Sequence, residues 1–348
     1  MKQAINRDYV LAFAEELLRT PSPTGFTQQV MKRIGKEVES LGYSFTQTPK
    51  GMGIITVPGE SDEVLGLTAH VDTLGGMVRS IKENGYIRFT PVGGYAMSSV
   101  ENEYCLIHTR DGGTISGTIL STHPSVHVYP DVREQKREEA NMEIRLDIDA
   151  DSKKAVLERG VRVGDFVSFD PRVQRVEGWL KSRHLDDKAS VACLFGLLEM
   201  LQREGRKPAR TLKLFITNYE EVGHGASYLP ADVAELLAVD MGAIGDDLSC
   251  TEKDVSICAK DSSGPYDYEM VSKLIRLAER EGLSFAVDIY PQYGSDASAA
   301  LRGGANLKGA LIGPGVHASH GMERTHEEAL WNTIALLAAY VLEDAQAL

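Results

Sequence analysis

The sequence predicts an α/β protein: a three-layer α/β/α sandwich with a mixed sheet, plus an inserted small all-β domain that is barrel-like. Toward both ends of the chain, apolar runs of strand length alternate with amphipathic segments of helix length. Between them, from about residue 75 to residue 170, short alternating segments are separated by Gly, Pro, Asn and Asp turns. We therefore expect residues 1–74 and 178–348 to form the α/β domain and residues 75–177 to form the inserted β domain.

Two helices followed by two strands are expected at the start of the α/β domain. In residues 9–19 and 27–41, apolar side chains recur every three or four positions, which is the spacing of one helical face. Apolar runs of strand length follow at residues 53–57 and 64–69, and the second run leads directly into His70.

The insertion is expected to consist of short strands joined by turns. The predicted strands are residues 86–90, 104–109, 114–120, 143–147 and 165–169. The charged stretch at residues 131–139 is expected to be an exposed loop.

After Trp179 the alternation of helices and strands returns. Helices are expected at residues 187–203, 231–237, 266–281, 295–301 and 326–345. Strands are expected at residues 211–217, 237–240, 255–259, 285–290 and 307–312. This alternation completes the layered domain that the N-terminal segment begins.

Composition and charge exclude several classes of function. The 348 residues carry a net charge of −13 without a basic run, so nucleic acid is not expected as a partner. No apolar stretch reaches the roughly 18 residues that span a bilayer, and the N-terminus lacks the pattern of a secretory signal, so no membrane partner is expected. The four cysteines show no CxxC pair or disulfide spacing, which is typical of reduced thiols and predicts a cytoplasmic protein.

Two adjacent carboxylates, Glu220 and Glu221, follow the apolar run at residues 212–219. At the end of a buried strand such a pair repels and loses hydration unless cations neutralise it. Neighbouring side chains point in different directions, so one carboxylate can bind a metal while the other faces a bound water. We prefer this interpretation to a solvated turn.

Two further candidate sites follow predicted strands. His70 and Asp72 are two positions apart and face the same side of an extended chain. Asp72 could therefore orient the imidazole on a metal, although a helix-capping turn would give the same pattern. Asp240 ends the apolar run at residues 236–239, where a lone Asp is more often a cap or turn residue.

Asp186 and Asp187 open a predicted helix. Asp187 is explained equally well as a helix N-cap, whereas Asp186 could bridge two cations with its two oxygens. After the last predicted strand, His317, His320 and His326 lie within ten residues, and we expect one of them to be a ligand.

In their order along the chain, these clusters resemble the motifs of the family-42 metallopeptidases. These are glutamyl and deblocking aminopeptidases with two cocatalytic metals, and some of them assemble as tetrahedral particles. The matching stretches are AHVD at 69–72, VGDFVSFD at 163–170, SRHLDDK at 182–188, NYEEVG at 218–223, VD at 239–240 and SHG at 319–321. The resemblance covers essentially the whole chain, including the inserted β domain.

The resemblance implies a role for each candidate residue. The implied ligands of two divalent cations are His70, Asp186, Glu221, Asp240 and His320. Asp186 would bridge the cations, Glu220 would act as the general base, and Asp72 would orient His70. Typical members carry His-Ser-Pro at the last ligand, whereas His320 is followed here by Gly-Met-Glu-Arg-Thr-His, so His326 is a rival.

These expectations describe a dinuclear metal-dependent aminopeptidase that removes N-terminal residues from short peptides. Two cations, zinc, cobalt or manganese, would share a water, and Glu220 would take its proton and return it to the leaving amine. The alternatives are a metal-dependent deacylase or amidohydrolase acting on an amidated small molecule, a glucanase-type hydrolase, and a non-catalytic scaffold. The resemblance also implies a homo-oligomer, for example a dodecamer, with the β domain gating substrate, forming subunit contacts, or both.

Overall fold

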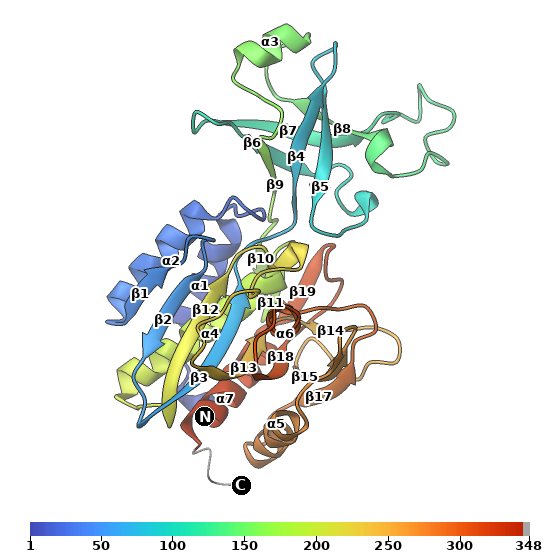
Figure 1. Cartoon of the computed structure of the whole chain (residues 1–348). Helices are drawn as coiled ribbons and strands as arrows, with labels where there is room; N and C mark the ends of the chain where they lie inside the picture. The colour runs from blue at the N-terminus through green and yellow to red at the C-terminus, as the bar shows by residue number, and fades with distance from the viewer. Residues whose placement is uncertain (344–348) are drawn as a thin grey trace.

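A ten-stranded mixed sheet flanked by helices forms the body of the protein (Figure 1). The computed structural model describes residues 1–343. The strands along the sheet are β1 (Ser44–Gln47), β2 (Gly53–Val57), β12 (Arg210–Thr217), β3 (Ser61–His70), β13 (Val233–Val239), β18 (Lys308–Val316), β15 (Val255–Asp261) and β16 (Gly264–Pro265). Two more strands lie off this path: β14 (Gly242–Ala243) pairs with β18, and β17 (Phe285–Ile289) pairs with β15.

The centre of the sheet is parallel. Strand β3 pairs in parallel with β12 on one side and with β13 on the other, and β13 pairs in parallel with β18. The carboxyl ends of these strands therefore lie at one edge of the sheet, where ligand sites of α/β proteins gather.

Seven α-helices and four short 3₁₀ helices are formed by the described residues. The α-helices are α1 (Arg7–Arg19), α2 (Gln28–Ser40), α3 (Lys153–Glu158), α4 (Leu185–Glu204), α5 (Tyr268–Arg280), α6 (Asp296–Arg302) and α7 (Glu327–Leu342). The 3₁₀ helices are η1 (Lys2–Ala4), η2 (Met97–Ser99), η3 (Glu139–Asn141) and η4 (Glu220–Val222). The predicted end of the last helix, at residue 345, lies outside the described residues.

Helix α4 is the central helix of the body. It is buried along nearly its whole length and packs against α1, α7 and β3, which explains why it is apolar on all sides. At Gly196 an added Cβ would lie 2.7 Å from Val10 and 2.8 Å from Ile334, so glycine is what lets α1 and α7 approach α4 this closely.

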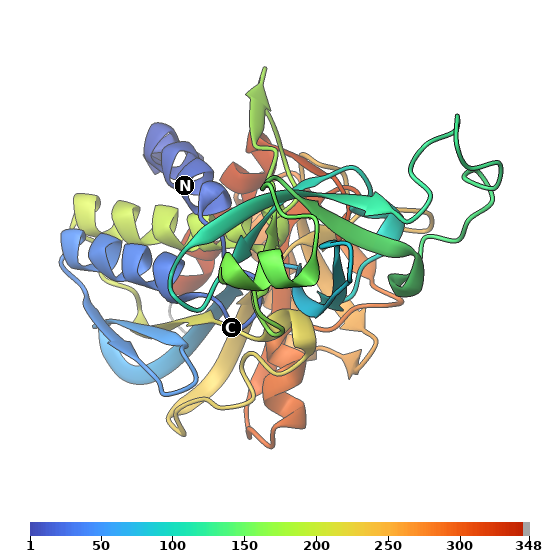
Figure 2. The ribbon, with the colours of Figure 1, turned by 90° about the horizontal axis from the view of Figure 1, so that it is seen from above.

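Six antiparallel strands form a closed barrel that stands on the body (Figure 1). In order around the barrel they are β4 (Gly75–Ile81), β5 (Ile87–Val92), β8 (Met142–Leu146), β7 (Thr114–Ser121), β6 (Tyr104–His108) and β9 (Phe166–Phe169). The barrel has its own hydrophobic core, and closure leaves it without free strand edges. Seen from above, the chain between β7 and β8 projects sideways from the barrel (Figure 2).

A small three-stranded sheet lies where the chain returns from the barrel. It consists of β10 (Gln174–Val176), β11 (Trp179–Ser182) and β19 (Glu323–His326). The antiparallel pairing of β11 with β19 sets Ser182 opposite Glu323. The chain just before α4 is therefore held beside the chain that precedes α7.

The predicted architecture, an α/β sandwich with a mixed sheet and an additional β barrel, is confirmed, but one element was predicted wrongly. Residues 231–237 are not a helix, because the buried strand β13 begins at Val233. The spacing of Val233, Leu236 and Leu237 imitates a helical face, whereas pairing on both sides with β3 and β18 makes the segment a strand. No helix formed by residues 1–343 combines the length and the apolar character that crossing a bilayer requires.

Candidate metal centre

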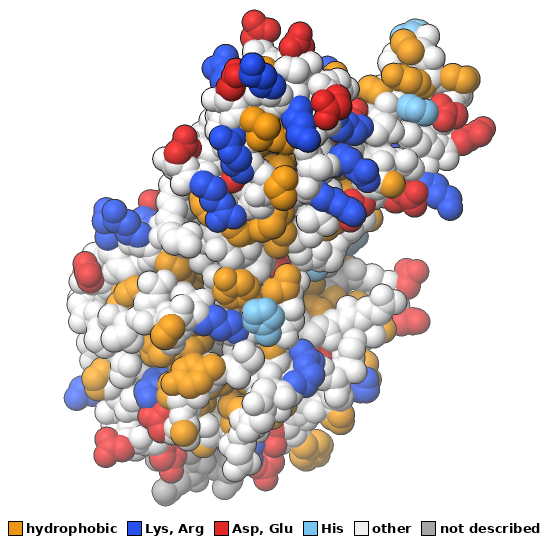
Figure 3. Space-filling model, turned by 45° about the horizontal axis from the view of Figure 1, so that its top comes forward, with side chains coloured by type: hydrophobic (Ala, Val, Ile, Leu, Met, Phe, Trp, Pro, Cys, Tyr) orange, Lys and Arg blue, Asp and Glu red, His pale blue; other side chains and the backbone are white. Residues whose placement is uncertain are grey.

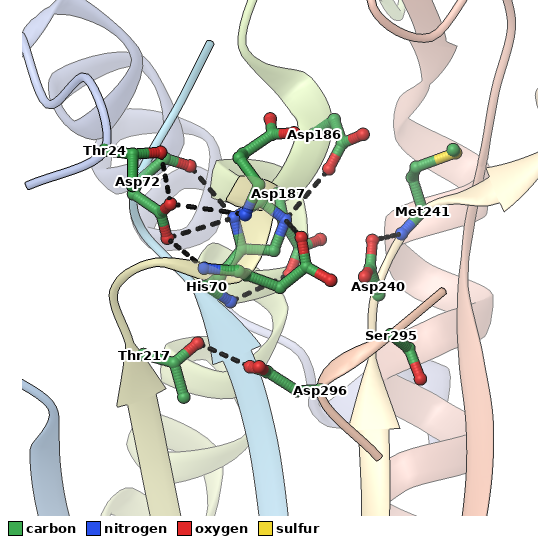
Figure 4. Close-up of polar contacts among 12 residues, drawn as sticks. Thr24, His70, Asp72, Asp186, Asp187, Thr217, Asp240, Met241, Ser295 and Asp296 are labelled. Atoms are coloured by element: carbon green, nitrogen blue, oxygen red, sulfur yellow. Dashed lines mark hydrogen bonds and ion pairs between the residues drawn. The ribbon is translucent and has the colours of Figure 1, made fainter. Parts of the chain in front are cut away.

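The carboxyl edge of the sheet brings predicted site residues together, and Figure 4 shows His70, Asp72, Asp186 and Asp240 among them. His70 is the last residue of β3, and Asp240 directly follows β13. Glu220 and Glu221 form the start of η4, which follows β12 after a short turn. Asp186 comes from the start of α4 and His320 from the loop between β18 and β19, so these segments converge on one cluster.

The carboxylate of Asp186 lies between two imidazoles. Its Oδ1 is 3.0 Å from Nε2 of His70, and its Oδ2 is 3.3 Å from Nε2 of His320. The same Nε2 of His320 is 3.3 Å from Oε2 of Glu221. A ring nitrogen of His70 and a carboxylate oxygen of Asp240 lie within 4.8 Å of each other.

Main-chain carbonyls fix the orientation of both imidazoles. Nδ1 of His70 lies 2.9 Å from the carbonyl oxygen of Asp72, and Nδ1 of His320 contacts the carbonyl oxygen of Gly94. A carbonyl oxygen can only accept a hydrogen bond, so each Nδ1 is the donor. In the neutral ring, Nε2 of both histidines then carries the lone pair that a metal requires.

Asp72, which was expected to orient His70, contacts that imidazole through its main-chain carbonyl and uses its carboxylate elsewhere. That carboxylate is 3.7 Å from Nδ1 of His70, beyond the nearer carbonyl of the same residue. Its oxygens instead accept the main-chain N–H groups of Glu220 at 3.2 Å and Glu221 at 3.4 Å, and the hydroxyl of Thr24 at 2.6 Å. Asp72 thus orients His70 through its main chain and fixes the turn of the two glutamates through its side chain.

Two other buried carboxylates hold the main chain of the cluster. Oδ2 of Asp187 accepts the N–H of His70 at 3.1 Å, so Asp187 supports a candidate ligand, while the N-cap position of α4 is taken by His184. Glu323 accepts the N–H groups of Asp186 and His320, both at 3.0 Å.

The cluster concentrates negative charge in a buried place. Burial, and then the charge of Asp186, raises the pKa of Glu221 to about 8 and that of Asp240 to about 7. Burial also raises the pKa of Glu220 well above its usual range. Burial acts to lower the pKa of His320, but the hydrogen bond to Asp186 and the charge of Glu221 raise it to about 11. Carboxylates that bind protons at neutral pH indicate a site that lacks positive charge.

This donor set fits two divalent cations. Two ligands that are about 2.0–2.1 Å from a tetrahedral ion lie about 3.3 Å from each other, close to the separations of 3.0 and 3.3 Å around Asp186. Four carboxylates, those of Asp186, Glu220, Glu221 and Asp240, would balance the charge of two divalent ions. The residues present therefore suit a dinuclear centre both in geometry and in charge.

His320 and His326 were the two candidates for the last ligand, and the structure places them differently. His320 reaches the cluster, whereas His326 caps α7 by accepting the N–H of Glu328 at 3.1 Å. Nearby, Tyr293 lines the cavity at the cluster, and Ser295 caps α6.

A cavity of about 550 Å³ opens onto the cluster. Asp186, Glu220, Glu221, Asp240 and His320 line it, so four of the five candidate ligands and the candidate base face the same space. Met241, Ala243 and Leu248 supply apolar surface to its wall.

Three contributors to the cluster were not predicted from the sequence: Thr24, Glu323 and the carbonyl of Gly94. Glu323 lies within the unusual stretch after His320, which was the one available signal. Neither Thr24 nor a main-chain carbonyl carries any pattern by which it could be recognised.

A family model and a relative of known sequence match most of this chain. A family model described as M42 glutamyl aminopeptidase matches residues 51–336. A protein named "Putative aminopeptidase YhfE" from Bacillus subtilis (strain 168) is 47% identical over 330 residues, which cover 94% of this chain and 95% of that protein.

Solved structures show the same fold. The TET aminopeptidase from the marine sediment archaeon Thaumarchaeota archaeon SCGC AB-539-E09 has a TM-score of 0.88 at 21% identity, covering 98% of both chains. The TET1 peptidase of Pyrococcus horikoshii has a TM-score of 0.84 at 24% identity, covering 96% of this chain and 99% of that chain. The match to the family model and the identity to YhfE together show that the chain belongs to the M42 glutamyl aminopeptidase family and is a metallo-aminopeptidase.

Proposed function

We propose that this metallo-aminopeptidase uses two divalent cations to remove N-terminal residues from short peptides, with Glu220 as the general base. The observation that carries the proposal is the position of Asp186, whose two oxygens each face the Nε2 atom of a different histidine. One carboxylate between two imidazoles is what a bridging ligand requires.

The five proposed ligands divide into two sides around Asp186. We name His70 and Asp240 the strand side, because both stand at the ends of sheet strands. We name Glu221 and His320 the loop side, because η4 and the loop before β19 supply them. When bound, the two ions supply Lewis-acid chemistry, which polarises the scissile carbonyl and lowers the pKa of a water. A mixed set of imidazole and carboxylate ligands suits zinc, cobalt or manganese.

Glu220 is placed to move the proton. It lines the cavity, its Oε2 is 3.7 Å from Nε2 of His70, and its main-chain N–H is held by Asp72. In the proposed reaction its carboxylate takes a proton from the attacking water and gives it to the leaving amine nitrogen. General base catalysis of this kind contributes roughly 10²–10⁴-fold.

The cavity supports a small substrate. Its volume of about 550 Å³ lies within the range of small-molecule sites, and one wall is apolar. A short peptide could place one side chain against Met241 and Leu248 while its scissile carbonyl faces the cluster.

A substrate panel with and without chelator tests the proposal. We expect hydrolysis of aminoacyl anilides with a free amino group, loss of activity with EDTA, and recovery on adding zinc, cobalt or manganese. Preferential cleavage of N-acylated substrates would instead indicate a deacylase of amidated small molecules. Glucan hydrolysis that survives chelation would contradict metal-dependent peptide cleavage, because glycosidases with two carboxylates work without metal.

Replacement of the adjacent glutamates separates their proposed roles. Glu220→Gln should keep both ions and lower kcat by about 10²–10⁴-fold, because only the proton acceptor is lost. Glu221→Gln is the matched control and should lose the loop-side ion. Metal analysis of both variants is the measurement, and near-normal turnover by Glu220→Gln would refute the assignment of the base.

We further propose that the protein is a cytoplasmic homo-oligomer and that residues 75–177 act as a unit in gating or assembly. The related structure PhTET1-12s is a dodecamer, so a dodecamer is the assembly to test first. The projection from the barrel exposes Val126 and Val128, and hydrophobic side chains gather at its tip (Figure 3). The four cysteines are buried and unpaired, which agrees with a reducing compartment. Light scattering of the purified protein would give the subunit number.

A further inference from the structure

We propose that Glu323 is a positioning residue that holds the loop side of the metal centre in its binding geometry. The inference rests on the dinuclear site proposed above and concerns a residue outside the ligand set. It accounts for part of the unusual stretch that follows His320, to which the proposed mechanism assigns no role.

Glu323 is a buried carboxylate between two ligand-bearing segments. It is the first residue of β19, only 1% of its surface is exposed, and it stands opposite Ser182 of β11. Strand β11 leads into α4 and Asp186, while the chain just before β19 carries His320. The pairing of two short strands therefore places this side chain between the bridging ligand and the last ligand.

Each oxygen of Glu323 binds one of these segments. Its Oε2 accepts the N–H of Asp186 at 3.0 Å, and its Oε1 accepts the N–H of His320, also at 3.0 Å. Because its two oxygens accept from different segments, this one side chain fixes the distance between the two main chains. Glu323 acts through Asp186 and His320 and not on the substrate.

The loop that carries His320 needs such an anchor. His320 has a φ of 61° and Ala318 a φ of 58°, so two residues with side chains occupy the left-handed region. Such conformations persist only where surrounding contacts determine them. Without an acceptor for its N–H, His320 would be free to leave this conformation, and its ring would move with it.

Within the metal centre, Glu323 affects the surroundings of His320. Nε2 of His320 lies 3.3 Å from Asp186 and 3.3 Å from Glu221, the spacing that suits two ligands of one ion. The carbonyl of Gly94 holds the far side of the ring at Nδ1, and Glu323 holds the main chain. The main-chain N–H of His70 instead donates to Asp187. The strand side therefore does not depend on Glu323 in the same way.

Metal titration of the metal-free protein tests the inference. Glu323→Gln keeps the size of the side chain but presents an NH₂ group to one of the two N–H donors. We expect the affinity for the second Co²⁺ to fall about 10–100-fold, the usual effect of losing a bond that supports a ligand, while the first Co²⁺ binds nearly as before. Glu323→Asp, which keeps the charge and can reach only one N–H, should give a smaller loss.

Asp288→Asn is the matched control. Asp288 is also buried and accepts two main-chain N–H groups, from Ser249 at 2.8 Å and Cys250 at 3.0 Å, away from the ligands. It should destabilise the fold without a selective loss of the second ion. Circular dichroism of each metal-free variant checks that it is folded, and Glu323→Asp serves if Glu323→Gln is not.

The outcomes separate this inference from the proposed function. If the wild type binds two Co²⁺ ions and both Glu323 variants bind them equally well, the positioning role is overturned and the dinuclear site stands. Equal weakening of both ions in Glu323→Gln and in Asp288→Asn would also overturn it, because the effect would be general. Binding of only one ion by the wild type would overturn the dinuclear proposal and this inference with it.

Discussion

The strand side and the loop side of the centre are built in different ways. His70 and Asp240 stand at the ends of adjacent parallel strands, and the sheet itself sets their separation. Glu221 and His320 stand in irregular segments, where three contacts from outside, those of Asp72, Glu323 and Gly94, set their positions. The side chain of His70 is 2% exposed and that of His320 is 36% exposed.

This difference indicates that the two sides will not hold their metal ions equally firmly. A strand end is fixed by many main-chain hydrogen bonds, whereas a loop conformation depends on a few side chains. The predictions below test that inequality.

The largest expected effect comes from the one ligand that both sides share. Asp186→Ala should lower the affinity for both ions by more than about 100-fold and abolish turnover. This loss is larger than the one expected when only a hydrogen bond that supports a ligand is removed. Metal content after dialysis is the measurement. Retention of one full equivalent would mean that Asp186 does not bridge.

A smaller and one-sided effect is expected from single histidines. His320→Ala should lose the loop-side ion and keep the strand-side ion, and His70→Ala should do the reverse. In the wild type, a chelator should remove the loop-side ion first, because His320 is the more exposed ligand. Simultaneous release of both ions in a stopped-flow chelation experiment would contradict the inequality.

Metal binding on both sides should also depend on pH. Without metal, the pKa of Glu221 is raised to about 8 and that of Asp240 to about 7, so both bind protons at pH values where free carboxylates are ionised. A metal binds only the deprotonated ligand, so binding releases protons and weakens as pH falls. As pH falls from 8 to 6, both ions should therefore bind more weakly. Calorimetry in buffers of different ionisation enthalpy would measure the protons, and release of none would contradict the prediction.

The smallest effect concerns the support of the glutamate turn. Thr24→Val removes the hydroxyl that donates to Asp72 at 2.6 Å and should lower the free energy of unfolding by about 1–3 kcal/mol, because a buried carboxylate loses a donor. Thr333→Val is the control, since that buried hydroxyl donates only to a helix carbonyl of Ala329. Urea unfolding of the metal-free proteins gives both values. A larger loss of stability in Thr333→Val than in Thr24→Val would contradict the importance of the hydrogen bond to Asp72.

The sequence predicts part of each side of the centre. Apolar runs lead into His70 and into the pair Glu220 and Glu221, whereas Asp240 follows a run whose first part was predicted as a helix and could equally have been a cap or turn residue. On the loop side, sequence spacing left His320 and His326 as alternatives, and only the three-dimensional path of the chain brings one of them to Asp186.

The remaining contacts could not be predicted, because they join distant segments without a pattern. Glu323 and Asp186 are separated by 137 positions, and Gly94 and His320 by 226. The same limitation explains the error at residues 231–237, where burial between two strands overrides a helix-like spacing.

The contact between the barrel and His320 is made by a peptide group and not by a side chain. An added Cβ at Gly94 would meet no heavy atom within 4 Å, so alanine at this position would leave the acceptor in place. Alanine at position 94 alone would therefore not reveal this link to the last ligand. Barrel sequences can diverge widely among relatives and still orient that imidazole, provided that the path of the backbone near residue 94 is kept.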